Sequence, residues 1–287
     1  MTEHIVIMAG GVGSRLYPLS TPEHPKQFID LLGCGKTLIQ LTYERFLALN
    51  PEARFWVVTS ASYTHFVREQ LPAIPEEQII AEPAARNTAP CIALACWKIK
   101  QRYPEANIVV TPADAYVPDI SAFASTLRTA LDFTRSGGAI VCVGIKPDSP
   151  HTGYGYIEAG AGEGVVKVKS FKEKPSLEVA EQYLAKGTYW WNAGIFVWRI
   201  DTIEAELRRF APQICSVMDR IAPSLYGAGE SAALEELFPQ CEKISIDYAV
   251  MEKSSDVYAV AADWRWSDLG SFEAIEKITG RDPRKSY

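Results

Sequence analysis

The stretch IVIMAGGVGSRLYPLS, residues 5–20, decides how the chain begins to fold. It opens with apolar, largely β-branched residues, which predict a buried strand, and then becomes rich in glycine before it reaches Arg15. Glycines beyond the carboxyl end of a strand let the backbone approach a ligand closely and present consecutive N–H groups to an anion. Arg15 adds a planar, permanently charged group that suits phosphate oxygens. The stretch therefore predicts an anion-binding loop, with a plain tight turn as the simpler alternative.

Two well-known phosphate-binding motifs do not match this loop. The dinucleotide fingerprint requires a third glycine three residues after Gly13, where the chain has Leu16. The segment GCGKT at residues 33–37 imitates the phosphate loop of nucleoside triphosphatases, but that motif requires glycine where the chain has Asp30. The loop is therefore of another kind. Lys26, in the segment PKQF just downstream, supplies a second cation that favours a polyphosphate ligand.

Strand-like and helix-like segments alternate up to residue 145, and this alternation predicts an α/β fold. The hydrophobic runs suit strands that are buried on both faces of the sheet. We expect a Rossmann-like, mainly parallel mixed sheet flanked by helices. The expected strands are residues 4–8, 54–59, 78–82, 107–111 and 139–145, and the expected helices are residues 37–49, 62–71, 88–103 and 121–133.

The pattern of apolar and polar residues changes after the first half of the sequence. Apolar and polar residues alternate around a glycine-rich turn at 154–160 and 164–174, which predicts a half-exposed hairpin and a smaller β-rich lobe. Ser176 is the expected cap of the helix that follows, and residues 189–199 predict a buried strand. Further helices are expected up to about residue 238.

Length and composition indicate an ordinary globular protein with a large core, because 47% of the 287 residues are hydrophobic. No repeat or linker interrupts the chain, so we expect one composite domain over residues 1–287, with halves at 1–150 and 151–287. A net charge of −6 argues against nucleic-acid and membrane partners, and no apolar run reaches the roughly 20 residues of a membrane helix. The amino terminus lacks the features of a signal peptide, and we expect a cytoplasmic protein.

The six cysteines and four histidines are scattered along the chain, without the spacing of a zinc site. We expect reduced thiols. Any bound metal is expected to be a hard cation held by carboxylates.

Eight blocks of sequence, in order along nearly the whole chain, resemble the sugar-1-phosphate nucleotidyltransferases, and among them the mannose-1-phosphate guanylyltransferases. One block alone is weak evidence, but the ordered set is specific. The chain departs from the family at Ala115, where members commonly have histidine. The blocks are AGGVGSRLYPLS with PKQF, EPAARNTAP (82–90), PADAYV (112–117), TGYGYI (152–157), FKEKP (171–175), WNAGIFVW (191–198), IDYAVMEK (246–253) and WSDLGS (266–271).

The resemblance implies a glycosyltransferase-A-like nucleotidyltransferase fold, in which residues 1–150 bind the nucleotide and residues 151–287 form a smaller, β-rich, sugar-binding lobe. It implies transfer of GMP from GTP to α-D-mannose 1-phosphate, which forms GDP-mannose and pyrophosphate by in-line, metal-assisted attack on the α-phosphorus. Mg²⁺ is the expected cofactor. Relatives often carry a further β-helical or isomerase domain, which we do not expect in this chain, and the oligomeric state, a homodimer included, stays open.

Four residues are predicted to be catalytic. Arg15 and Lys26 are the candidate cations for the triphosphate and the leaving pyrophosphate, and Lys174 resembles the lysine that holds the sugar phosphate in this family. Asp114 follows an expected strand, and Asp268 occupies the family's second aspartate position, so these two are expected to bind one Mg²⁺. The simpler alternatives are solvated lysines, a turn residue at Asp114 and a helix N-terminal acid at Asp268.

The base is expected near Glu82, at the end of a predicted strand. Guanine offers N1–H and N2–H₂ donors side by side, and a carboxylate can accept hydrogen bonds from both. The alternative is an ion pair between Glu82 and Arg86, with Thr88 as the cap of the next helix. The predicted nucleotide-binding residues are Ala9, Gly10, Gly11, Gly13, Glu82, Asn87 and Thr88.

The sugar phosphate is expected at the mouth of the second lobe, where Trp191 and Trp266 either wall the pocket or belong to the core. The predicted sugar-phosphate-binding residues are Tyr154, Gly155, Glu173, Lys174 and Asn192. Two other functions remain open. One is a nucleotidyltransferase that uses UTP, dTTP or ATP with glucose 1-phosphate, and the other is an inactive regulatory homologue.

Overall fold

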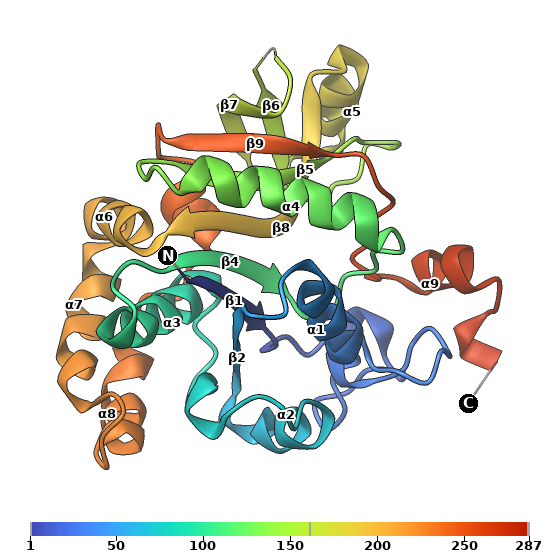
Figure 1. The fold of residues 1–287 in the computed structure, drawn as a ribbon. Helices are drawn as coiled ribbons and strands as arrows, with labels where there is room; N and C mark the ends of the chain where they lie inside the picture. Colours follow the sequence, from blue (N-terminus) through green and yellow to red (C-terminus); the bar gives the residue numbers. More distant parts are fainter. Residues whose placement is uncertain (1, 161, 286–287) are drawn as a thin grey trace.

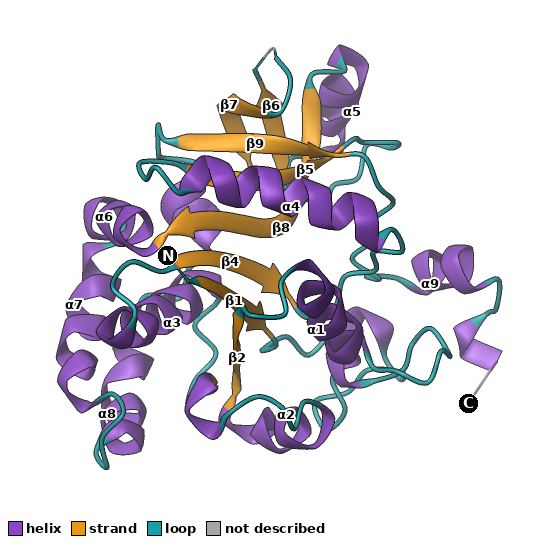
Figure 2. Cartoon of the chain, viewed as in Figure 1, coloured by secondary structure: helices purple, strands orange, loops and turns teal. Residues whose placement is uncertain are grey.

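The chain folds around one large sheet with helices on both sides (Figures 1 and 2). The structure is a computed structural model that describes residues 2–160 and 162–285. The strands are β1 (Glu3–Met8), β2 (Arg54–Ser60), β3 (Ile79–Glu82), β4 (Asn107–Pro112), β5 (Ile140–Ile145), β6 (Tyr156–Ala159), β7 (Val165–Lys172), β8 (Tyr189–Arg199) and β9 (Val257–Ala262). The helices are α1 (Leu38–Leu49), α2 (Thr64–Gln70), α3 (Thr88–Arg102), α4 (Ile120–Thr134), α5 (Leu177–Lys186), α6 (Ile200–Phe210), α7 (Pro212–Ile221), α8 (Glu230–Leu237) and α9 (Phe272–Thr279), and a π-helix covers Asp247–Met251. Within the described parts of the chain, none of the helices has the length and hydrophobicity needed to cross a membrane.

The described strands pair in the order β3-β2-β1-β4-β8-β5-β9-β7-β6, and β6 also pairs with β8. The pairs β1–β2, β1–β4, β2–β3 and β5–β9 are parallel, whereas β8 runs antiparallel between β4 and β5. The antiparallel hairpin β6–β7 extends the same sheet, because β6 pairs with β8 and β7 pairs with β9. The predicted mixed α/β sheet is confirmed. Its parallel order is interrupted where β8, from the second half of the chain, inserts beside β4.

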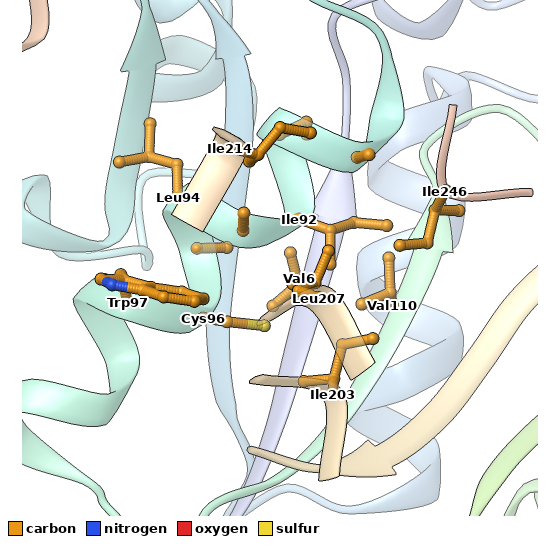
Figure 3. Close-up of a cluster of buried hydrophobic side chains, with 14 of the residues drawn as sticks. Val6, Ile92, Leu94, Cys96, Trp97, Val110, Ile203, Leu207, Ile214 and Ile246 are labelled. Carbon is orange, nitrogen blue, oxygen red and sulfur yellow. The ribbon is translucent and has the colours of Figure 1, made fainter. Parts of the chain in front are cut away.

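The central strands are buried on both faces, as their unbroken hydrophobic runs predict. Along β1, Val6 packs into the core on one face, while Ile5 and Ile7 pack into the core on the other face. Figure 3 shows the first core, where Ile92 of α3 and Leu207 of α6 gather around Val6. Helices α1 and α4 cover the second core (Figure 1). The alternation of side chains along the strands therefore produces three layers.

A smaller hydrophobic cluster lies away from the sheet and joins two segments that are distant in the sequence. It contains Leu16 and Leu19, which follow the glycine-rich loop, together with Leu38 of α1 and, from the carboxyl-terminal part, Leu269 and Ile275. Leu269 is fully buried, although its φ of +48° lies in the left-handed region that leucine rarely adopts. This packing holds the segment before α9 beside the glycine-rich loop (Figure 1).

Two helix caps refine the sequence-based expectations. Helix α3 is capped by Asn87, whose side-chain oxygen accepts a hydrogen bond from the Thr88 N–H at 2.8 Å. The Thr88 hydroxyl oxygen instead accepts from the Ile246 N–H at 2.8 Å, so the alternative in which Thr88 caps this helix is wrong. Ser176 stands at the capping position of α5, as predicted, but its side chain makes no capping hydrogen bond.

His4 is a buried titratable group at the end of the sheet opposite the glycine-rich loop. Trp56 donates a hydrogen bond from Nε1 to His4 Nδ1 at 3.0 Å, and His4 Nε2 lies 3.0 Å from the Thr2 hydroxyl. Because Trp56 can only donate, Nδ1 must carry no proton, and the imidazole is held neutral. Burial, together with the nearby charge of Arg54, lowers the pKa of His4 to about 4.

We expect this histidine to make the fold sensitive to acid. The unfolded chain binds the proton near pH 6.5, the ordinary value, whereas the folded chain binds it only near pH 4, so stability is lost as the pH falls between these values. The loss from this one group is about 3 kcal/mol. Urea unfolding across this pH range measures it, and His4→Gln, which cannot titrate, is the control. An equal pH dependence in both proteins would contradict the assignment.

Candidate active site

A cleft of about 290 Å³ opens where the carboxyl ends of β1 and β4 meet β8. In sheets of this kind ligands bind at the carboxyl ends of the parallel strands. Many of the residues predicted from the sequence line this cleft together. They are Arg15, Lys26, Thr88, Asp114, Tyr154, Gly155, Glu173, Asn192 and Asp268.

Lys26 joins the two predicted metal-binding aspartates. Its ammonium group lies 2.9 Å from Asp114 Oδ2 and donates a hydrogen bond to the backbone carbonyl of Asp268 at 2.7 Å. Lys26 is only 7% exposed, so this contact is shielded from water. Arg15, which is largely exposed, pairs with Asp268 Oδ2 at 3.3 Å. The structure therefore places Asp114 and Asp268 in one cleft, each beside a cation.

Two further contacts fix Asp268. Tyr154 donates a hydrogen bond from its hydroxyl to Asp268 Oδ1 at 2.8 Å, and burial and the charge of Asp268 raise the pKa of this tyrosine. Ser267 and Tyr116 exchange backbone hydrogen bonds, which tie the segment before α9 to the segment that follows Asp114. Tyr154 is predicted from the sequence to contact the sugar, but its hydroxyl is already used to orient a carboxylate.

The donor set fits a hard divalent cation that arrives with phosphate groups. Asp114 and Asp268 present carboxylate oxygens to the same cleft. In the described parts of the chain, no cluster of three or more histidine, cysteine or acidic side chains could hold a metal ion alone. Mg²⁺ typically takes one or two protein carboxylates and completes its shell with phosphate oxygens and water. Two carboxylates are therefore enough if the substrate supplies the remaining ligands.

Gln27 holds the glycine-rich loop in place. Its side-chain amide donates hydrogen bonds to the carbonyls of Ala9 and Gly11, at 2.9 and 2.8 Å, and the Thr59 hydroxyl also donates to Ala9. These hydrogen bonds hold the backbone at the start of the glycine-rich loop. No role for Gln27 was predicted from the sequence. Its only signal was its place beside Lys26 in the segment PKQF.

Glu82 lies beneath the glycine-rich loop. A Cβ atom on Gly10 would lie 3.3 Å from Glu82 Oε2, and burial raises the pKa of Glu82 to about 8. Within the described residues Glu82 forms no ion pair with Arg86, so the alternative of a simple ion pair is wrong. The predicted nucleotide-binding residues that do not line the cleft are Ala9, Gly10, Gly11, Gly13, Glu82 and Asn87.

Four of the five predicted sugar-phosphate-binding residues, Tyr154, Gly155, Glu173 and Asn192, line the cleft. Glu173 Oε1 pairs with Lys174 Nζ at 2.8 Å, and Lys174 has a φ of +44° but does not line the cleft. Trp266 lines the cleft and packs edge-to-face on Tyr154, whereas Trp191 lies buried behind that ring. One tryptophan is therefore a wall of the cleft and the other is part of the core.

The cleft also contains Asp247, for which the sequence predicted no role. This residue begins the π-helix and lines the same end of the cleft as Glu173. Burial, and then the charge of Glu173, raise the pKa of Asp247 to about 7. Its only sequence signal was membership of the block IDYAVMEK.

A mixed α/β sheet with a glycine-rich loop, two cations and two aspartates at its carboxyl edge is an arrangement suited to phosphate groups. The family model described as nucleotidyl transferase matches residues 4–284, and the chain belongs to this family.

Similar proteins agree with the resemblance drawn from the eight blocks, which is confirmed. Mannose-1-phosphate guanylyltransferase of Escherichia coli strain K12 is 40% identical over 288 residues, which are 96% of this chain and 59% of that protein. ManC of Salmonella typhimurium strain LT2, a mannose-1-phosphate guanylyltransferase, is 38% identical over 97% of this chain and 60% of its own length. A crystal structure described as mannose-1-phosphate geranyltransferase from Thermus thermophilus superimposes with a TM-score of 0.87 and 34% identity, over 99% of this chain and 81% of that chain. The chain thus spans about three fifths of the curated relatives it matches.

We expect Gly13→Ala to destabilise the protein, because Gly13 has a φ of +69° and a Cβ atom there would lie 2.9 Å from Lys26 Cγ. The left-handed backbone alone costs about 1–2 kcal/mol for a residue with a side chain. Gly11→Ala is the matched control, since a Cβ on Gly11 meets nothing within 4 Å. Urea unfolding compares the two variants with the parent protein, and equal stability of both variants would contradict the strained loop.

Proposed function

We propose that this chain transfers GMP from GTP to α-D-mannose 1-phosphate and so forms GDP-mannose and pyrophosphate. The observation that carries the proposal is the contact of Lys26 with both Asp114 and Asp268, beside a glycine-rich loop and Arg15. The relatives at 38–40% identity bear the name mannose-1-phosphate guanylyltransferase. Their names support the choice of base and sugar.

The reaction needs positioning and charge neutralisation more than it needs a nucleophilic side chain. The attacking oxygen belongs to a phosphate that is already ionised at neutral pH, so no general base is required. Two phosphate groups that approach each other repel, and cations must offset this repulsion. Arg15 and Lys26 do so on the triphosphate and on the leaving pyrophosphate, and Lys174 does so on the sugar phosphate. Catalysis then depends on holding the two reactants in line.

Asp114 and Asp268 would hold Mg²⁺ in this site. When bound, the metal ion neutralises negative charge on the triphosphate and helps to align it. Without ligands the two carboxylates are balanced by Lys26 and Arg15. Phosphate oxygens offer these two cations alternative partners, which leaves both carboxylates available as ligands. Tyr154 keeps Asp268 oriented through its hydroxyl.

The base and the sugar occupy opposite ends of the site. Glu82, below Gly10, accepts hydrogen bonds from guanine, with Asn87 and Thr88 nearby at the start of α3. Glu173 and Asn192 line the part of the cleft that receives the sugar. A nucleotidyltransferase that uses another nucleotide and glucose 1-phosphate is the second candidate, and it is separated from the first by assaying four nucleoside triphosphates with two sugar 1-phosphates.

We expect Asp114→Asn and Asp268→Asn to lower kcat/KM by about a hundredfold or more, because each loses a charged ligand next to the reacting phosphates. Pyrophosphate release from GTP and mannose 1-phosphate measures this, and removal of Mg²⁺ with a chelator should abolish release by the parent protein. Asp132→Asn, at an exposed ion pair on α4, is the control for charge. Near-normal rates in either variant at saturating Mg²⁺ would refute the metal assignment.

We expect Glu82→Gln to weaken discrimination for GTP. Glu82, with its pKa near 8, must release its proton to accept from both guanine N–H groups, and an amide cannot do this, so the KM for GTP should rise by about tenfold to a hundredfold. Steady-state assays with GTP, ATP, UTP and dTTP measure the change. Glu77→Gln, at an exposed ion pair just before β3, is the control. Unchanged selectivity in Glu82→Gln would show that guanine is recognised elsewhere.

A further inference from the structure

Asp247 is the acidic residue of the cleft for which the proposed reaction has no use. It lies far from the Lys26 contact in sequence and reaches the cleft through the turn that begins the π-helix. It is not one of the two aspartates next to Lys26 and Arg15. A carboxylate enclosed in a binding cleft carries a desolvation cost, and such residues often serve a ligand.

Asn192 fixes the position of this carboxylate. The Asn192 side-chain oxygen accepts a hydrogen bond from the Gly194 N–H at 3.0 Å, which sets the orientation of the amide. The amide nitrogen must then donate, and it does so to Asp247 Oδ1 at 3.0 Å. The backbone N–H of Asn192 donates to the Gly155 carbonyl at 2.8 Å, so strand β8 carries the arrangement. Asp247 is therefore held rigidly toward the cleft.

The other carboxylate at this end, Glu173, is committed to protein contacts. Its Oε1 pairs with Lys174 at 2.8 Å. Its Oε2 packs so closely on the backbone of Gly155 that a Cβ there would lie 2.6 Å away. Glu173 is 8% exposed. Asp247 accepts the Asn192 hydrogen bond at Oδ1 and lines the cleft, so its carboxyl group has acceptor positions left for a ligand with hydroxyl groups.

We propose that Asp247 is a specificity-determining residue whose carboxyl group accepts hydrogen bonds from ring hydroxyls of the sugar phosphate. This inference rests on the proposed function, because it requires a sugar phosphate in the cleft. A carboxyl group can accept from two neighbouring hydroxyls at once, which suits a hexose ring. The raised pKa of Asp247, caused by burial and by Glu173, agrees with a carboxyl group enclosed at this end of the cleft.

The test compares the parent protein with Asp247→Asn, each assayed with mannose 1-phosphate and with its deoxy derivatives. Asp247→Asn keeps the size of the side chain and an acceptor for Asn192. The KM for mannose 1-phosphate should rise by about tenfold to a hundredfold with a small change in kcat and in the KM for GTP, because the amide replaces an acceptor oxygen by an NH₂ donor. With the 2-, 3-, 4- and 6-deoxy derivatives of mannose 1-phosphate, the difference between the parent protein and Asp247→Asn should disappear for the derivative that lacks the contacted hydroxyl.

Controls separate this outcome from a structural role. Asp256→Asn, at an exposed ion pair after the π-helix, should leave every KM unchanged. Asp247→Ser is the second variant if Asp247→Asn does not fold. An equal change for all derivatives, or a lowered unfolding midpoint with unchanged KM values, would overturn the inference. If the parent protein forms no GDP-mannose, the proposed function fails and this inference fails with it, whereas product formation without the predicted pattern contradicts the inference alone.

Discussion

The buried ammonium group of Lys26 is the contact on which the rest of the site depends. It contacts the side chain of Asp114 and the backbone of Asp268. Asp268 lies 242 residues after Lys26 in the chain. Burying a charge in this way brings little net stability, because desolvation offsets the attraction. Its effect is geometric instead. Two carboxylates that would repel each other are kept in one cleft, beside Arg15.

The surrounding structure makes this contact rigid. The cluster of Leu16, Leu38 and Leu269 packs the two distant segments together, and backbone hydrogen bonds join Ser267 to Tyr116. Strained backbone occurs next to site residues, at Leu269 after Asp268 and at Lys174 after Glu173. Such conformations persist only where packing determines them, and Leu269 is fully buried. The strained backbone conformations therefore lie directly after two carboxylates of the cleft, Asp268 and Glu173.

Alternating strands and helices, and the glycine-rich loop, were predictable because they depend on local periodicity and on backbone freedom. The convergence of Asp114 and Asp268 was not, since no local pattern encodes a contact between residues 154 positions apart, and only the resemblance brought these two together. The roles of Gln27 and Asn87 depend on which carbonyl or N–H group lies nearby in space, so Thr88 was a plausible but wrong cap. Asp247 enters the cleft through a π-helix, which has no distinctive sequence signal.

Different charged groups line different parts of the cleft, and this difference would set the orientation of the sugar phosphate in the proposed reaction. Lys26 and Arg15 lie at one end, whereas Glu173 and Asp247 lie at the other, with the charge of Glu173 raising the pKa of Asp247. A sugar phosphate is itself asymmetric, because its phosphate is an anion and its ring is a set of neutral donors. Under the proposed function, Mg²⁺ held by Asp114 and Asp268 would leave Lys26 and Arg15 free to attract the phosphate, whereas Glu173 and Asp247 would accept hydrogen bonds from hydroxyls. In the proposed reaction, charge would therefore orient the phosphate of the acceptor toward the triphosphate before any contact distinguishes one sugar from another.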